Sequence, residues 1–98
     1  MPRLGVVGTL VWDTIYDRPG NWADPVEEWG GIAYSLAGFD AALSNNWSLL
    51  PIVKVGQDMR DSADRFLEGL VHLDSLDGIR TVAEPNNRVE LMYVDEAR

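Results

Sequence analysis

The sequence predicts an α/β protein in which helices alternate with the strands of a largely parallel sheet. Apolar runs containing β-branched residues recur at residues 3–8, 47–56 and 79–82, as expected for strands. Between them, residues 30–43 and 58–70 carry apolar side chains at spacings of three and four, which is typical of amphipathic helices. This order of strands and helices is that of a sheet built from right-handed βαβ units.

The first run is expected to form the central strand. It is β-branched and closed by Gly8, the pattern of a strand covered on both faces. Residues 9–16 continue extended, and the Asp-Arg-Pro-Gly-Asn sequence at residues 17–21 is a strong turn signal. We therefore expect a hairpin or lid-like excursion over residues 14–29.

Each predicted helix has one apolar stripe. The first helix opens at the pair Gly30-Gly31, and its stripe consists of Ile32, Leu36, Phe39 and Leu43. The stripe of the second helix consists of Ala63, Phe66, Leu67 and Leu70. Asp58 or Asp61 is expected to cap this second helix.

Two features concern the later strands. Pro51 lies within residues 47–56 and cannot donate a hydrogen bond to a sheet, which argues against the first half of that strand. After a turn at residues 85–87, residues 88–94 alternate in polarity, so we expect a last strand with one solvent-exposed face. The chain then ends as a strand entering a hairpin tip, which predicts that it is the first part of a larger structure.

The composition is that of one globular domain with an acidic surface. The chain has 98 residues, of which 46% are hydrophobic, and this is enough for one core. Eight Lys and Arg against sixteen Asp and Glu leave a net charge of -8, which disfavours binding to nucleic acid or to an anionic membrane. The absence of cysteine and the single His72 argue against a metal site, and we expect a cytoplasmic protein.

A candidate ligand site follows the first strand. Asp13 lies just beyond the glycine that closes this strand, and Gly30-Gly31 opens the next helix. Ligands of open α/β sheets bind beyond the carboxyl ends of the strands, where a helix N-terminus also offers free N–H groups. Asp13 and the two glycines could therefore meet over a sugar or polyol. The alternative is that Asp13 only ends a strand and the glycines only permit a turn.

Three sequence blocks carry a resemblance to a known family. They are Gly-Thr-Leu-Val-Trp-Asp at residues 8–13, Gly-Gly-Ile-Ala-Tyr-Ser-Leu-Ala at residues 30–37 and Val-Lys-Val-Gly-Gln-Asp at residues 53–58. In this order and spacing they resemble the amino-terminal half of the ribokinase-like (PfkB) carbohydrate kinases. The resemblance implies a Rossmann-like α/β/α sandwich with a small β-sheet lid, of which this chain would be the amino-terminal portion, with lid segments at about residues 14–29 and 86–98.

The resemblance also implies an activity. Members of this family use ATP and Mg²⁺ to phosphorylate a hydroxyl group of a sugar or related alcohol. By position, Asp13 matches the acid that binds substrate hydroxyls, and Gly30 and Gly31 match the glycine pair that lines the sugar pocket. Ser35 stands where the family commonly has Asn, so ribose in particular is not implied. The Val-Gly-x-Asp sequence at residues 55–58 matches a strand-to-helix turn with a largely structural role.

Other residues are weaker candidates for ligand contact. Arg88 could reach an anionic substrate, although residues 86–88 are more simply explained as turn and surface residues. Trp22 and Trp29, in the predicted lid, are the tryptophans best placed to contact a ligand.

The resemblance implies that the catalytic part lies outside these residues. Family members are considerably longer, and their catalytic base, anion hole and most of the ATP pocket come from a Gly-Ala-Gly-Asp segment that this sequence lacks. We therefore expect the isolated chain to be inactive, and we expect the complete protein to form a homodimer through its lid. The alternative is a non-catalytic α/β module that binds a small polar ligand or a protein partner.

Overall fold

A computed structural model describes residues 2–16 and 24–92 of the chain. Along the chain, the elements are β1 (Arg3–Tyr16), β2 (Val26–Gly31), α1 (Ile32–Ala42), β3 (Ser48–Gly56), a short 3₁₀ helix (Gln57–Met59), α2 (Arg60–Glu68), β4 (Ile79–Val82) and β5 (Arg88–Met92). The alternation of strands and helices expected from the sequence is confirmed. The parts of the predicted lid at residues 17–23 and 93–98, including Trp22, lie outside the described residues.

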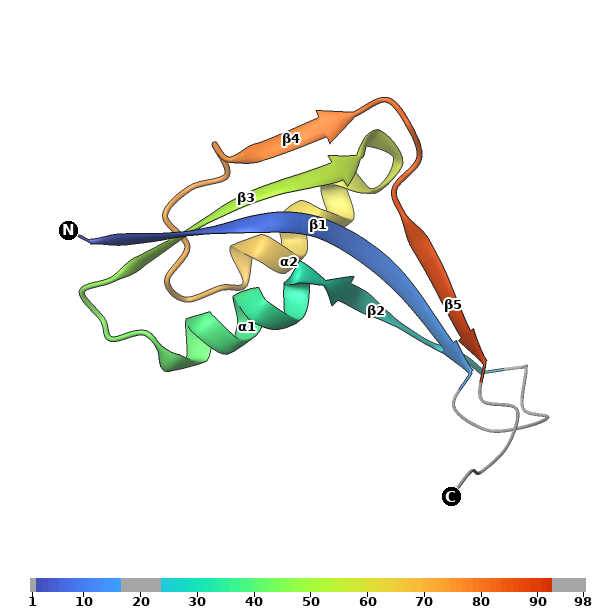
Figure 1. The fold of residues 1–98 in the computed structure, drawn as a ribbon, viewed down its shortest axis with the longest axis horizontal. Helices are drawn as coiled ribbons and strands as arrows, with labels where there is room; N and C mark the ends of the chain where they lie inside the picture. Colours follow the sequence, from blue (N-terminus) through green and yellow to red (C-terminus); the bar gives the residue numbers. More distant parts are fainter. Residues whose placement is uncertain (1, 17–23, 93–98) are drawn as a thin grey trace, which may run out of the picture.

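The long strand β1 is the centre of the sheet. Its first half pairs in parallel with β3, from Arg3 opposite Ser48 to Thr9 opposite Lys54, and β3 pairs in parallel with β4. Its second half forms an antiparallel pair with β2 and a parallel pair with β5. Figure 1 shows β1 bending between these two halves. One strand therefore links the parallel sheet to the strands β2 and β5. The pairing of β1 with β2 runs from Leu10 opposite Gly31 to Ile15 opposite Val26, so it begins before and ends after the excursion expected at residues 14–29.

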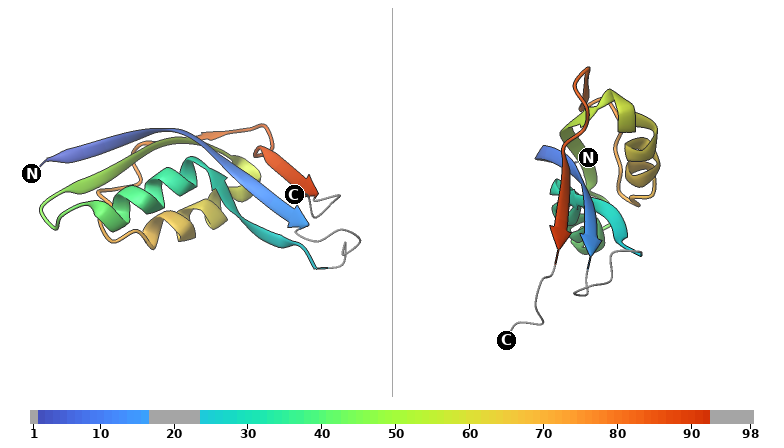
Figure 2. Two further views of the ribbon diagram at one scale, coloured as in Figure 1. Left: turned by 60° about the horizontal axis from the view of Figure 1, so that its bottom comes forward. Right: turned by 90° about the vertical axis from the view of Figure 1, so that its right-hand side faces the viewer.

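Both helices lie on one side of the parallel sheet (Figure 2, left). The core is formed by the buried apolar side chains of that side, namely Val6, Leu10, Trp29, Ala33, Leu36, Leu49, Val53, Val55, Ala63 and Leu67. Neighbouring residues on a strand point to opposite faces, so Val7 lies on the other face, where it is 72% exposed. Among the described residues, no helix covers this second face.

Helix α1 begins where the sequence predicts, but its buried stripe is narrower than predicted. Gly31 precedes it with φ +61°, and a Cβ at this position would approach the carbonyl oxygen of Thr9 to 2.8 Å. This conformation and this close approach both favour glycine. Leu36 is fully buried as expected, whereas Phe39 is 42% exposed. The helix is therefore held to the sheet mainly by its first two turns.

The predicted cap of α2 is wrong. Met59 occupies the N-cap position, and no side chain caps the helix. Asp58 instead accepts a hydrogen bond from the backbone N–H of Asn86 and pairs with Arg88. A carboxylate near a helix start caps it only when no better donor competes, and here a loop about thirty residues away supplies two.

Pro51 is accommodated in the middle of β3. The N–H groups of Leu49 and Val53 point away from β1, to His72 and Gly78. Pro51 has the same orientation, and β4 begins opposite Val53, so the missing donor faces a position where the ladder to β4 has not started. The proline therefore costs this strand no ladder hydrogen bond.

The last strand differs from its predicted form. All five residues of β5 are exposed, including the apolar Val89, Leu91 and Met92. The alternating pattern led us to expect one buried face. In the described part of the chain, β5 pairs only with β1, and Arg88 at its start also pairs with Asp58.

Candidate functional site

The structure brings Asp13 and Gly30 into direct contact. Asp13 lies opposite Glu28 in the pairing of β1 with β2, and it is only 8% exposed. A Cβ placed on Gly30 would collide with Oδ2 of Asp13. The carboxylate therefore occupies the space that any other residue at position 30 would fill.

Asp13 is 8% exposed as a residue, and its carboxylate has no protein donor. Among residues 2–16 and 24–92, no hydrogen bond or ion pair to its oxygens is formed. The register partner of Asp13 on β2 is Glu28, and the hydroxyl of Tyr34 donates to Oε2 of Glu28 at 3.0 Å. This hydrogen bond, followed by partial burial and by the charges of Glu28 and Asp13, raises the pKa of Tyr34 above its usual value. A carboxylate with free lone pairs can accept hydrogen bonds from hydroxyl groups of a ligand.

The two other predicted site residues lie at the start of α1. Gly31 is exposed and precedes the first helical turn, next to Gly30. Ser35 is exposed on α1, and the structure shows no hydrogen bond between its hydroxyl and any described residue. Asp13 and Gly30 are thus in van der Waals contact, and Gly31 is the next residue in the chain. Ser35 forms no hydrogen bond with any of these three residues.

The burial of Asn86 differs most from what its sequence predicts. We expected a turn or surface residue, but Asn86 is 6% exposed. Its Oδ1 accepts from the N–H of Gly56 at 2.8 Å, and its Nδ2 donates to the carbonyl oxygens of Leu10 and Asn87 at 3.2 and 3.0 Å. The amide therefore joins the carboxyl end of β3 to the middle of β1. A local turn pattern carries no signal for such a contact.

Arg88 is engaged in the same assembly. Its guanidinium lies 2.8 Å from Oδ2 of Asp58. The hydrogen bond from the Asn86 N–H, together with Arg88, lowers the pKa of Asp58 below its usual value, although partial burial acts in the opposite direction. The Val-Gly-x-Asp sequence thus holds the 86–88 segment in place. Arg88 is an ion-pair partner here and not a free cation.

Trp29, a candidate for ligand contact, packs in the core, as large aromatic side chains more often do. This side chain is buried in the core, where it meets Trp12 edge to face, with ring centroids 5.1 Å apart and an interplanar angle of 77°. The two residues are directly opposite in the pairing of β1 with β2, so cross-strand packing decides their arrangement.

His72, in the loop that follows α2, contacts helix α1. Its Nδ1 lies 3.0 Å from Oδ1 of Asp40, and both side chains are largely buried. Asp40 also accepts the backbone N–H groups of Val71 and His72. This contact fastens the last turns of α1 to the loop that follows α2.

Neither a cluster of metal-ligating side chains nor a membrane-spanning helix is found in the described residues. In residues 2–16 and 24–92, no group of three or more His, Asp or Glu side chains is arranged to hold a metal ion. No helix in this part of the chain has both the length and the apolar character needed to cross a membrane.

Comparison with known proteins supports the fold. Neither a protein-family model nor a curated protein sequence matches this chain. Among solved structures, the chain is similar to the nucleoside kinase of Methanocaldococcus jannaschii, which is described as an archaeal member of the ribokinase family. The TM-score is 0.71 at 17% sequence identity, and the match covers 100% of this chain and 35% of that one, so the chain spans about a third of the kinase. The chain therefore has an α/β structure with the ribokinase-like fold.

Proposed function

We propose that this chain carries the substrate-binding part of an ATP-dependent kinase that phosphorylates a hydroxyl group of a sugar or related alcohol. The observation that carries the proposal is the carboxylate of Asp13, a residue only 8% exposed, which lies against Gly30 and has no protein donor. The ribokinase-like fold supports it, because the fold neighbour is a nucleoside kinase. Asp13 would accept hydrogen bonds from ligand hydroxyls. Gly30 leaves room for the Asp13 carboxylate, and Gly31 and Ser35 would lie at the border of the site.

The contribution of these residues is positional. Phosphoryl transfer depends on holding the acceptor hydroxyl in line with the phosphate and on neutralising phosphate charge. Asp13 can orient an alcohol, but the described residues do not fit the Mg²⁺ that accompanies ATP, since they form no metal-binding cluster. We therefore propose that ATP and Mg²⁺ are bound mainly by residues beyond this chain, and that the 98-residue chain has no kinase activity alone.

The test is ligand binding by the chain and by two matched variants. Binding of a panel of sugars and nucleosides is measured by saturation-transfer NMR and calorimetry. Asp13→Asn keeps the shape of the side chain but changes one acceptor into a donor, and we expect at least tenfold weaker binding. Asp61→Asn removes the same charge on the exposed start of α2, and we expect affinity within twofold of the unaltered chain. Equal affinities of both variants, or no binding of any alcohol, would contradict the proposal.

A second candidate is a non-catalytic module that binds a partner through β5. The exposed Val89, Leu91 and Met92 of this strand favour it, because an uncovered strand can pair with a further strand. The same surface is where a homodimer of the complete protein would form if its lid pairs with that of a second copy. Sedimentation of the chain with and without Leu91→Lys distinguishes these cases from a monomer: a dimer that this substitution disrupts supports self-association through β5.

A further inference from the structure

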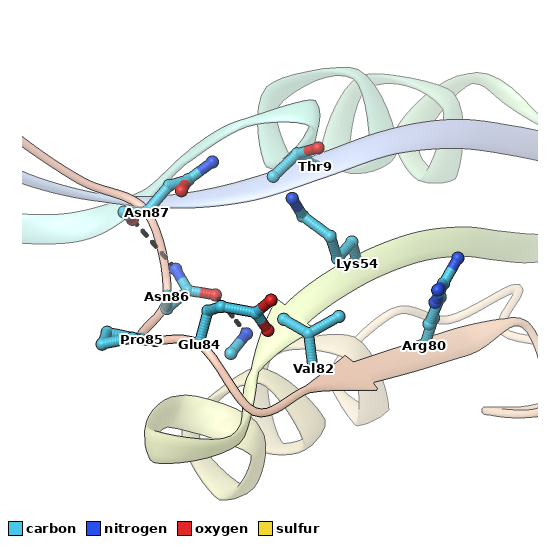
Figure 3. A pocket seen from close by; sticks show the side chains of 9 residues that line it. Thr9, Lys54, Arg80, Val82, Glu84, Pro85, Asn86 and Asn87 are labelled. Carbon is cyan, nitrogen blue, oxygen red and sulfur yellow. Dashed lines mark hydrogen bonds between the residues drawn. The ribbon is translucent and has the colours of Figure 1, made fainter.

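A pocket lies beside Gly56 and Val82, the last residues of β3 and β4, and extends across the sheet to Thr9 in the middle of β1. Thr9 on β1, Lys54 on β3 and Arg80 on β4 are register partners, so their side chains form one row across the sheet. They line a pocket with a volume of about 460 Å³. Figure 3 shows the amine of Lys54 reaching toward Thr9 and the guanidinium of Arg80 directed to the same side of the sheet. This is the edge of an open α/β sheet where ligands bind.

The charge of this pocket is unlike that of the rest of the chain. Lys54 and Arg80 have no ion-pair partner among the described residues, and neither has Arg65 on α2, whereas Arg3, Arg60 and Arg88 each pair with an aspartate. Glu84 contributes one carboxylate to the lining, and neither cation is in ion-pair contact with it. In a chain with a net charge of -8, this leaves a locally positive hollow. Two unpaired cations this close together repel each other, and a bound anion would remove that repulsion.

The pocket also has neutral donors and a rigid wall. The hydroxyl of Thr9 and the side-chain amide of Asn87 line it. The neighbouring Asn86 has its amide oxygen and nitrogen occupied by bonds to Gly56, Leu10 and Asn87, which fixes the wall in place. Adjacent strands are about 4.8 Å apart, so Lys54 and Arg80 can contact different oxygens of one small anion. Arg is suited to bidentate contact and Lys to contact as a point charge, a combination suited to phosphate.

We propose that Thr9, Lys54, Arg80 and Asn87 bind a phosphate group. This site is separate from the contact between Asp13 and Gly30: Thr9 and Asp13 lie on the same face of β1 but about 13 Å apart along the strand. The proposal goes beyond the proposed function, because it requires neither kinase activity nor an alcohol ligand.

The experiment titrates inorganic phosphate into the full 98-residue chain, followed by calorimetry and by ¹⁵N chemical shifts. We expect saturable binding with the largest shifts at Thr9, Lys54 and Arg80. Lys54→Met and Arg80→Gln should each weaken binding at least tenfold. The control is Arg65→Gln, which removes one positive charge from the exposed end of α2, and its affinity should stay within twofold. Thermal unfolding of each variant verifies that it is folded as well as the unaltered chain.

A second ligand, glycerol 3-phosphate, identifies the source of the phosphate. Glycerol 3-phosphate that binds at least as tightly as inorganic phosphate assigns the site to a phosphorylated ligand. Tenfold weaker binding of this ester assigns the site to the free ion. Absence of phosphate binding, displacement of phosphate by equal concentrations of acetate, or a loss of affinity in Arg65→Gln equal to that in Lys54→Met would overturn the proposal.

Discussion

The backbone N–H of Gly56 donates to Oδ1 of Asn86 at 2.8 Å, across thirty positions of sequence. This hydrogen bond lies where β3 ends and where the segment leading into β5 passes over the sheet. A Cβ on Gly56 would collide with the backbone of Asn86, so this close approach needs glycine at position 56. The first prediction follows from this contact.

Asn86→Ala should destabilise the fold strongly. The substitution leaves the Gly56 N–H and the Leu10 carbonyl without their partner at a buried position. Each buried group left unpaired costs about 1 to 3 kcal/mol, so we expect a loss of about 2 to 4 kcal/mol in the free energy of unfolding. Urea unfolding measures it. Asn87→Ala, at the exposed neighbouring position, should change the stability by less than about 0.5 kcal/mol; a similar loss in both variants would show that the Asn86 amide is not responsible.

Gly30→Ala should be destabilising because its methyl group collides with Asp13. We expect a loss of about 2 kcal/mol or more, and the double variant Asp13→Ala with Gly30→Ala should lose less than the sum of the two single variants. The control is Gly38→Ala in α1, where a Cβ meets nothing within 4 Å. That substitution should stabilise the chain by about 0.5 to 1 kcal/mol, since alanine is the better helix former. Additive losses in the double variant would place the strain elsewhere.

The stability of the chain should fall in acid through Asp40. Burial acts to raise the pKa of this carboxyl, but hydrogen bonds from the N–H groups of His72 and Val71 and contact with the His72 ring outweigh it, and the pKa lies below the ordinary value of 3.8. A carboxyl whose pKa is lower in the folded state stabilises the fold above its unfolded pKa, and this stabilisation is lost as the pH falls through the folded value.

Asp40→Asn tests this directly. The variant should be less stable than the unaltered chain at pH 7, and the difference should shrink steadily below about pH 4. Thermal unfolding from pH 2 to pH 7 measures both curves. The pKa of Asp58 is also lowered in the folded state, so the unaltered chain and the Asp40→Asn variant will both lose stability in acid through Asp58. If the difference in stability between the two chains is constant across this range, the ionisation of Asp40 is not the source of the pH dependence.

Local patterns determined the secondary structure of this protein to a large extent. The stripe of α1, the glycine pair before it and the β-branched runs of β1, β3 and β4 each depend on residues close together in sequence. The spacing of apolar residues alone sets which side of a helix or strand can be buried. For the candidate site, the pattern named Asp13, Gly30 and Gly31, and the fold brings the first two into contact.

Tertiary structure decided which polar groups meet. Asn86 is buried between β1 and β3, Asp58 binds Asn86 and Arg88 instead of capping α2, and His72 is paired with Asp40. Trp29 packs on Trp12 in the core, although its neighbours in sequence are polar or glycine. The sequence by itself determined the elements and their order, because helix and strand periodicity is a local property. The partners of Asn86, Asp58 and His72 depend on where distant segments cross, and only the folded chain brings those segments together.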